Sequence, residues 1–427
     1  MTQPTSEATR IESLDILRGF ALLGILLLNI LGFGMLSASY SNPGFDLVGA
    51  STINWLVWGG IDICAEGAMR TLFSVLFGAG VVLFSTGERG KAAALHYKRT
   101  FLLLLFGLFD AYLLLWSGDI LMCYAMVGFL LYLIRHWHVK SLLITAGILL
   151  VLISLMYLGM NGALSLLKSA ADEVAQSDDP TSLSEETRSM AAEWDVFIRD
   201  YEMTPESRAE EREARSGSYL SAFRWNAEQV LGVLVFVIPA ILFWDALVMM
   251  MIGMALYKAG VLQGDRSRMF YWRLMIAGFT VGLTINSFEV FRAVNSDMAV
   301  LSTLGQMQFT YQFGRLGMAF GYIGLIILLL KAGVMGWLRL RLGAVGRMAL
   351  TNYLMHSFIC LFVFTGAGLG LVDELSRAQL YFVVFAIWVL QLWFSPWWLT
   401  RYRFGPVEWL WRALTYGERP ANKRVTV

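Results

Sequence analysis

Long apolar runs separated by short polar connections dominate this chain. Ten runs approach or exceed the roughly 20 residues of helix that cross the 30 Å hydrocarbon core of a bilayer. We place these runs at 14–36, 65–86, 100–117, 119–134, 141–160, 228–257, 272–291, 308–330, 348–371 and 380–400. Backbone polar groups in lipid must be satisfied within the segment, so the runs predict helices. The expected fold is all-α, a polytopic transmembrane helical bundle of about ten spans.

Composition strengthens this interpretation. Of 427 residues, 57% are hydrophobic and 15% are charged, and the mean hydropathy is +0.60. The net charge of +1 gives no information about nucleic-acid binding, and we expect no nucleic-acid partner. The three cysteines are isolated and form no CxxC or Cys/His spacing, so we predict neither a metal site nor a disulfide.

One polar segment divides the chain into two membrane halves. Residues 168–224 contain 14 acidic and 7 basic residues and have the patterning of short amphipathic helices. We therefore expect an N-terminal membrane half at 1–167 and a C-terminal half at 225–427, each with five spans. The C-terminal half should end in an interfacial amphipathic helix. We interpret the acidic insertion as a solvated spacer, with a lid over a substrate as the alternative.

Orientation follows from the distribution of Lys and Arg. With a cytoplasmic N-terminus, 22 of the 33 basic residues fall on the cytoplasmic side, 9 on the opposite side and two inside spans. This asymmetry matches the positive-inside rule. We expect both termini in the cytoplasm and the acidic insertion outside it.

The first span carries an unusual polar stripe formed by Asp15, Arg18 and Asn29. On a helix, Arg18 and Asn29 lie about 60° and 40° from the direction of Asp15, so the three side chains share one face. Polar groups are costly in lipid and therefore usually face a protein interior or a cavity. This helix is a candidate wall of a binding site.

Other ionisable or amide side chains also fall inside apolar runs and imply a shared polar interior. Glu66 and Arg70 are four residues apart and are placed to pair on one helix face. Glu289 and Arg315 are a second candidate neutralising pair, and both pairs have the alternative role of fixing helix register. The remaining intramembrane candidates are Asp110, Asp119, Asp245, Asn286, Asn352 and His356.

Six strings along the chain resemble, in the same order, those of YeiB-like bacterial inner-membrane proteins. They are LDILRGFALLGILLLNILGFG, ASYSNP, TLFSVLFGAG, WSGDILMCYAMVG, GRMALTNYLMHSFIC and GPVEWLWRALTYG. The first span also resembles the transmembrane acyltransferase superfamily, which includes heparan-α-glucosaminide N-acetyltransferase. The resemblance implies a bacterial inner-membrane enzyme that moves an acyl group from cytoplasmic acyl-CoA or acetyl-CoA to an extracytoplasmic or membrane-embedded acceptor.

The elements shared with that superfamily are Asp15, Arg18 and Gly19 at the cytoplasmic end and Asn29 in the span. The human-type enzyme uses a histidine after its first span, but this chain has none there. Tyr40 and Asn42 occupy that region and are candidate substrate-binding residues. We therefore predict direct acyl transfer rather than an acyl-histidine intermediate.

Acyl transfer needs a general base and donors that stabilise an oxyanion. Asp110 is the candidate base, with His356 as the alternative. Asn29, with Arg70 or Arg315, can supply the donors. The other candidate substrate-binding residues are Asp15, Arg18, Tyr40, Asn42, Glu66, Asp119, Glu289 and Asn352.

Cytoplasmic basic residues such as Arg18 and Arg347 can hold the phosphates of CoA. The acceptor can be a glycan, a lipid or another small molecule, and the expected partners are membrane lipid and a second copy in a homodimer. No metal is predicted. Two other classes stay open, namely a small-molecule transporter with a polar intramembrane path and a non-catalytic membrane scaffold.

Overall fold

The computed structural model of this chain describes residues 11–40, 42–45, 51–86, 92–305 and 309–424. This part of the chain is helical, with one isolated β-bridge between Tyr402 and Lys423, and the predicted all-α fold class is confirmed. Arg10, Arg89 and Lys91, which entered the charge count, lie outside the described residues. The α-helices are α1 (Glu12–Gly34), α2 (Thr52–Ala65), α3 (Ala68–Thr86), α4 (Ala92–Leu113), α5 (Leu121–Leu131), α6 (Val139–Gln176), α7 (Glu185–Glu202), α8 (Pro205–Ser216), α9 (Tyr219–Gly232), α10 (Phe243–Lys258), α11 (Arg268–Asn295), α12 (Val300–Gly305), α13 (Phe309–Ala332), α14 (Gly336–Arg347), α15 (Ala349–Phe364), α16 (Arg377–Arg401) and α17 (Pro406–Tyr416).

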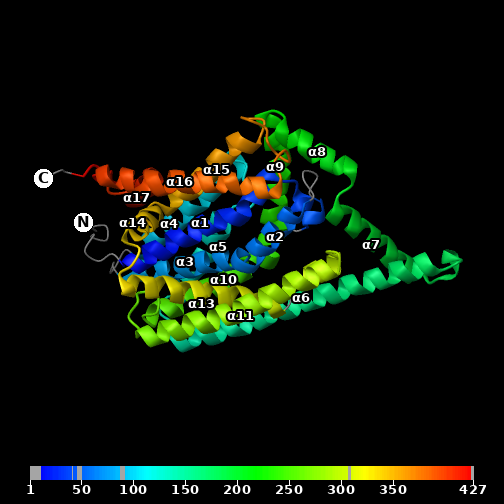
Figure 1. Cartoon of the computed structure of the whole chain (residues 1–427), viewed down its shortest axis with the longest axis horizontal. Coiled ribbons are helices and arrows are strands. Elements are labelled where there is room, and N and C mark those ends of the chain that lie inside the picture. Colours follow the sequence, from blue (N-terminus) through cyan, green and yellow to red (C-terminus); the bar gives the residue numbers. More distant parts are fainter. Residues whose placement is uncertain (1–10, 41, 46–50, 87–91, 306–308, 425–427) are drawn as a thin grey trace.

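The long helices run side by side between two ends of the molecule (Figure 1). Helices α14 and α17 mark one end, which we call the α17 end, and α8 marks the opposite α8 end. A π-helical stretch, η5 (Val233–Leu242), joins α9 to α10 into one continuous run. Helix α6 has 38 residues and is about 57 Å long, so it projects with α7 beyond the rest of the bundle (Figure 1).

Among the residues that the structure describes, seven helical runs are long and apolar enough to cross a membrane, and an eighth is counted if the bent pair α14 and α15 is one span. The chain is thus a multi-pass membrane protein, but the prediction of ten such spans was wrong by this measure. The runs predicted at 100–117 and 119–134 are not counted as membrane spans, and the reason differs between them. Helix α4 carries Lys98, Arg99 and Asp110, and α5 has only 11 residues, about 16 Å of helix. Helices α14 and α15 meet at 82°.

Helix α4 nevertheless connects the two ends of the bundle. The indole of Trp411 in α17 donates a hydrogen bond to the carbonyl of Arg99 near the start of α4. At the other end of α4, the Tyr219 hydroxyl of α9 donates to the carbonyl of Leu113. Of its charged residues, Asp110 is completely buried and Arg99 is half-buried, whereas Lys98 is exposed near the α17 end. The costly charge in the middle of the helix therefore faces the protein interior.

Close helix contacts at glycine set the positions of the charged side chains. A Cβ added to Gly78 of α3 would lie 2.0 Å from the carbonyl oxygen of Met250, and one added to Gly253 of α10 would lie 2.0 Å from that of Val75. Only glycine permits such an approach of two backbones. The contact holds Arg70 of α3 next to Asp245 of α10.

Helices α11 and α13 also pack through small residues. A Cβ on Gly278 would lie 2.5 Å from the backbone nitrogen of Gly321, and one on Gly317 would lie 2.7 Å from that of Gly282. Small residues on both helices thus allow the two backbones to approach closely. These contacts leave α13 fixed beside the interior, where it supplies a buried arginine to the charge network described below.

Candidate functional site

The described helices line two cavities, one toward the α8 end of the bundle and one toward the α17 end. The larger has a volume of about 460 Å³ and the smaller about 270 Å³. Helix α8 borders the larger cavity, and α17 borders the smaller. The charged side chains that line the larger cavity are Glu66, Arg70, Arg215 and Asp245.

Asp245 is the centre of the charge network at the larger cavity. It accepts two hydrogen bonds from the guanidinium of Arg315 in α13, one of them 3.0 Å long between Nη1 and Oδ2. It also lies 3.7 Å from Nη2 of Arg70. Arg315 is only 1% exposed and is further bonded to Gln312. One carboxylate therefore neutralises two arginines from neighbouring helices.

The two ion pairs predicted within the sequence are not the ones that the structure forms. Arg70 was expected to pair with Glu66, but its ion-pair partner is Asp245. Arg315 was expected to pair with Glu289, and it also pairs with Asp245. Glu289 is bonded instead by the Thr310 side chain. Spacing along one helix predicts which residues share a face, but here the pairing is made across helices whose crossing the sequence does not specify.

Glu66 and Arg70 are connected through a tyrosine. The Tyr311 hydroxyl donates to Oε1 of Glu66 at 3.1 Å and accepts from Nη2 of Arg70 at 3.4 Å. Gly67, with φ of +64°, separates α2 from α3 between these residues and allows the chain to turn there. The Arg70 side chain keeps 35% of its surface exposed, and since Arg70 lines the larger cavity, its guanidinium is accessible to a ligand there.

Asn29 and Tyr40 also line the larger cavity, as their selection as site residues requires. Asn29 lies on α1 and Tyr40 follows the short turn after that helix. Asn42 has a local role instead, because its Oδ1 accepts a hydrogen bond from the backbone of Gly44 and it is not part of the cavity lining. Three predicted residues from different parts of the sequence, Asn29, Tyr40 and Arg70, are thus brought together.

Arg215 of α8 forms the roof of the larger cavity. Its guanidinium donates hydrogen bonds to the carbonyls of Gly32, Phe33 and Met35 at 2.7 to 2.8 Å and to Glu211 at 2.8 Å. These carbonyls belong to the last turn of α1 and its cap, where the helix has no further backbone donors. At least this part of the insertion is not a solvated spacer.

The smaller cavity is rich in arginine. Its lining includes Arg18, Arg99, Arg347 and Arg412 and a single carboxylate, Glu408. Arg18 also bonds Asp15 at 3.2 Å, so the stripe of the first helix leads to this cavity at its α17 end. Four guanidinium groups around one cavity favour an anionic ligand, and phosphate is the group that arginine binds best through paired hydrogen bonds.

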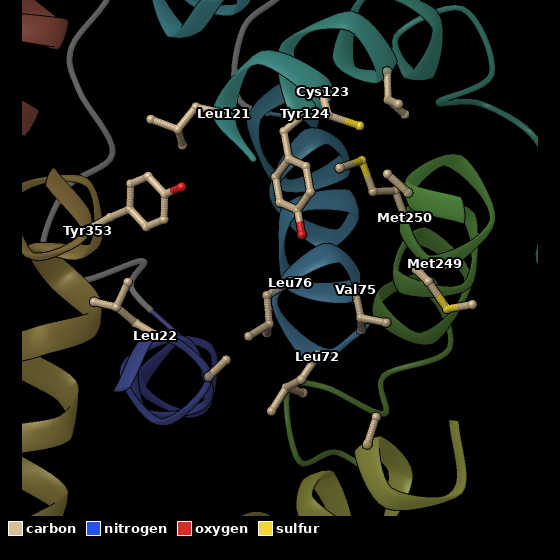
Figure 2. Close-up of a cluster of buried hydrophobic side chains, with 14 of the residues drawn as sticks. Leu22, Leu72, Val75, Leu76, Leu121, Cys123, Tyr124, Met249, Met250 and Tyr353 are labelled. Atoms are coloured by element: carbon tan, nitrogen blue, oxygen red, sulfur yellow. The ribbon is translucent and has the colours of Figure 1, made fainter. Parts of the chain in front are cut away.

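Tyr124 of α5 is shared by both cavity linings. Its hydroxyl lies 2.5 Å from the hydroxyl of Ser74 in α3. Figure 2 shows the Tyr124 ring against α3, between Tyr353 on one side and Met250 on the other. This ring and the surrounding buried side chains separate the two cavities.

Asp110 and Asp119 lie together beside this partition. Asp110 is completely buried next to Asp119 and Ser357, and it lines neither cavity. Asp119 caps the start of α5 by accepting from the backbone of Met122 at 2.8 Å, and it accepts from the Tyr353 hydroxyl at 3.1 Å. Because Tyr353 lines the smaller cavity, its hydroxyl connects Asp119 to that lining.

His356 and Asn352 are enclosed between α15 and α16. His356 Nε2 is 3.0 Å from Oε1 of Gln391, whose amide donates to the Asn352 carbonyl. The Asn352 side chain donates to Ser395 at 3.0 Å. Neither residue lines a cavity, so this network joins two helices, and the structure provides no contact with a ligand for the alternative base.

Sequence reasoning missed several residues of the site. Arg215 gave no signal, because Glu211 and Arg215 four residues apart are typical of an exposed helix. Tyr124, Tyr311 and Tyr353 were overlooked because tyrosine in an apolar run is usually read as core. Among the described residues, no group of three or more His, Cys, Asp or Glu side chains has the arrangement of a metal site.

Comparison with known proteins identifies relatives along nearly the whole chain. Residues 256–418 match a family described as a protein of unknown function (DUF418). The uncharacterized protein YeiB of Escherichia coli (strain K12) is 33% identical over 407 residues, which cover 94% of this chain and 95% of the relative. The uncharacterized protein YxaH of Bacillus subtilis (strain 168) is 29% identical, covering 100% of this chain and 99% of the relative. No solved structure matches the chain.

Proposed function

The chain belongs to the YeiB-like family of membrane proteins, and we propose that it transfers an acyl group from an acyl-CoA donor in the smaller cavity to an acceptor in the larger one. The observation that carries the proposal is the shared Tyr124 wall between an arginine-rich cavity and a second cavity near the other end of the bundle. Two cavities that meet at one side chain suit a reaction between two ligands that enter from opposite sides.

The smaller cavity suits the donor. Coenzyme A carries phosphates that Arg18, Arg347 and Arg412 can bind, and its thin pantetheine arm can direct a thioester toward Tyr124. We place the α17 end in the cytoplasm of a bacterial cell, with the chain in the inner membrane, because acyl-CoA is made there and because the positive-inside rule favours that orientation. The larger cavity then faces the extracytoplasmic side.

The reaction exchanges one acyl bond for another. The hydroxyl or amine of the acceptor attacks the thioester carbonyl, the bond from carbon to sulfur breaks, and CoA leaves as a thiolate that takes up a proton. Arg70 and Asn29 can donate to the developing oxyanion from the larger cavity. Tyr353 lines the smaller cavity, so the acceptor's attacking group must reach past Tyr124 to the thioester, where the Tyr353 hydroxyl can pass its proton to Asp119. Asp110 beside Asp119 remains the second carboxylate of this pair.

The decisive test is acyl-CoA binding by purified protein in lipid nanodiscs, followed by loss of the thioester. We expect wild-type protein to bind acetyl-CoA or a longer acyl-CoA, and Arg347→Gln to weaken binding by about tenfold, since a charge-assisted hydrogen bond is lost. Arg339→Gln is the matched control at the same end, because Arg339 pairs with Glu12 outside the cavity lining. Binding should be unchanged there.

The outcomes separate the function classes. If folded protein binds no acyl-CoA of any chain length, the acyltransferase proposal is refuted. Substrate flux across liposomes without consumption of a thioester would instead establish a transporter. If acyl-CoA binds and is consumed, a screen of glycan, lipid and amine acceptors then identifies the second substrate by transfer of a labelled acyl group.

A further inference from the structure

Helix α8 is held on the bundle mainly by polar contacts, together with the Arg208 guanidinium, which lies 4.7 Å from the centre of the Phe45 ring. Its only buried residues are Glu211 and Arg215. No apolar side chain of this helix is buried, so its docking lacks the hydrophobic contribution that holds the long helices together. Segments fixed mainly by polar contacts open at a lower free energy than a packed core.

The polar contacts converge on the end of α1. Arg215 binds three carbonyls there, while the Glu211 carboxylate accepts from the backbone and side chain of Ser37 at 3.0 to 3.2 Å. A second attachment lies further out, where Arg212 bonds Asp373. We call the contacts of Glu211, Arg212 and Arg215 the α8 latch.

Both ends of α8 have short joints. Met203 and Thr204 separate it from α7, and Gly217 and Ser218 separate it from α9. The joint at Gly217 is anchored, because the Gly366 backbone donates to the Arg215 carbonyl at 3.1 Å and Gly366 packs closely on the Gly217 carbonyl, so α8 can swing about this end once its side-chain contacts are released. Met203 has φ of +56°, a backbone conformation that an L-residue rarely adopts. Thr204 caps α8 and Ser218 caps α9 through side-chain hydrogen bonds, so each helix can keep its structure while the joints rotate.

From these contacts we propose that α8 is a gate for the larger cavity, latched by Arg215. Arg215 belongs both to the latch and to the cavity lining, so release of the latch removes a wall of the cavity. The ligand that passes the gate is a polar molecule from the aqueous side, because the roof consists of charged groups and backbone carbonyls. The proposal concerns access to the cavity and holds whether or not an acyl group is transferred.

Accessibility of one cysteine tests the gate without any substrate. A reporter is made by Asn29→Cys in a background in which Cys64, Cys123 and Cys360 are replaced by Ser, and a charged methanethiosulfonate is added from the α8 side of protein in liposomes. We expect slow modification with an intact latch. Arg215→Gln should increase the rate about tenfold or more, since several hydrogen bonds from a charged group are lost.

Two controls set the expected lower and upper rates of thiol modification. Arg188→Gln is the matched substitution on α7, where Arg188 is exposed, and it should leave the rate unchanged. Ser182→Cys, also exposed, gives the rate for an unprotected thiol. If Arg215→Gln does not fold, Arg212→Gln weakens only the outer attachment and should still give an increase of a few fold.

Two results would overturn the gate. One is an intact-latch reporter modified as fast as Ser182→Cys, which would mean that α8 does not close the cavity. The other is folded Arg215→Gln, or Arg212→Gln in its place, with an unchanged rate. Neither result depends on acyl-CoA, so failure of the gate and failure of the acyltransferase proposal are distinguishable.

Discussion

Removing the carboxylate at the centre of the charge network should destabilise the protein by about 3 kcal/mol. Asp245→Asn keeps the shape of the side chain but leaves Arg315, which is 1% exposed, without its ion pair. Breaking one partner of a buried pair costs about 3 to 5 kcal/mol. We expect the lower end of this range, because Gln312 still accepts from Arg315.

The free energy of unfolding can be measured by equilibrium unfolding in mixed micelles, with tryptophan fluorescence as the signal. Asp172→Asn is the matched control. It breaks the exposed pair with Lys168, whose side chains are 44% and 54% exposed, and it should cost at most about 1 kcal/mol. Combining Asp245→Asn with Arg315→Gln should recover most of the loss, since the uncompensated cation is gone.

The reasoning is refuted if Asp245→Asn costs no more than Asp172→Asn. It is also refuted if the double variant is as unstable as the sum of its single variants. Either result would mean that water or another group compensates Arg315, and the network would not be the register lock that its burial indicates.

Three further predictions address the two cavities and the α17 end. Tyr124→Ala should join the two cavities and increase the hydrolysis of acyl-CoA in the absence of acceptor, measured by release of free CoA. Tyr124→Phe should keep the partition and the low hydrolysis rate. Equal hydrolysis rates for both variants would contradict the role of the ring. Asp110→Asn should abolish transfer while leaving acyl-CoA binding and folding intact, so retained transfer would remove Asp110 from the proton path. Burial raises the pKa of Glu408, which accepts from Thr351, above its unfolded value, so the folded state holds its proton more tightly. The free energy of unfolding of wild type minus that of Glu408→Gln should be highest at acid pH and should fall as pH rises from about 4.5 through the raised pKa. If this difference in unfolding free energy rises with pH in the same range, the assignment is contradicted.

The sequence predicted the faces of single helices well. Asn29, Glu66 and Arg70 were selected because each is polar within an apolar run, and all three line the larger cavity. Arg18 was assigned to the cytoplasmic end and lines the smaller cavity. A polar group that is costly in lipid must face the interior, so one helix and its period are enough for this inference.

Contacts between helices were beyond the same reasoning. The partner of Arg315 depends on how α13 and α10 lie relative to each other, and that relation is set by glycine contacts spread over several helices. The predicted number of spans was too high because α5 is short and α4 is charged, and both still pack within the bundle although neither is a long apolar helix. The α8 latch was missed because the charges of Glu211 and Arg215 look like those of a solvated surface until α1 supplies the carbonyls.

The difference in charge between the cavities bears on the choice between an enzyme and a transporter. At the larger cavity, Asp245 and Glu66 lie among Arg70 and Arg315, and Arg215 is paired with Glu211, so positive and negative charges balance. At the smaller cavity, the four lining arginines exceed the two nearby carboxylates, Glu408 in the lining and Asp15, which pairs with Arg18. In an alternating-access carrier, one fixed central site serves both sides of the membrane in turn. A balanced cavity and a basic cavity separated by an aromatic ring instead fit two different ligands, an anionic one from the α17 end and a less charged one from the α8 end.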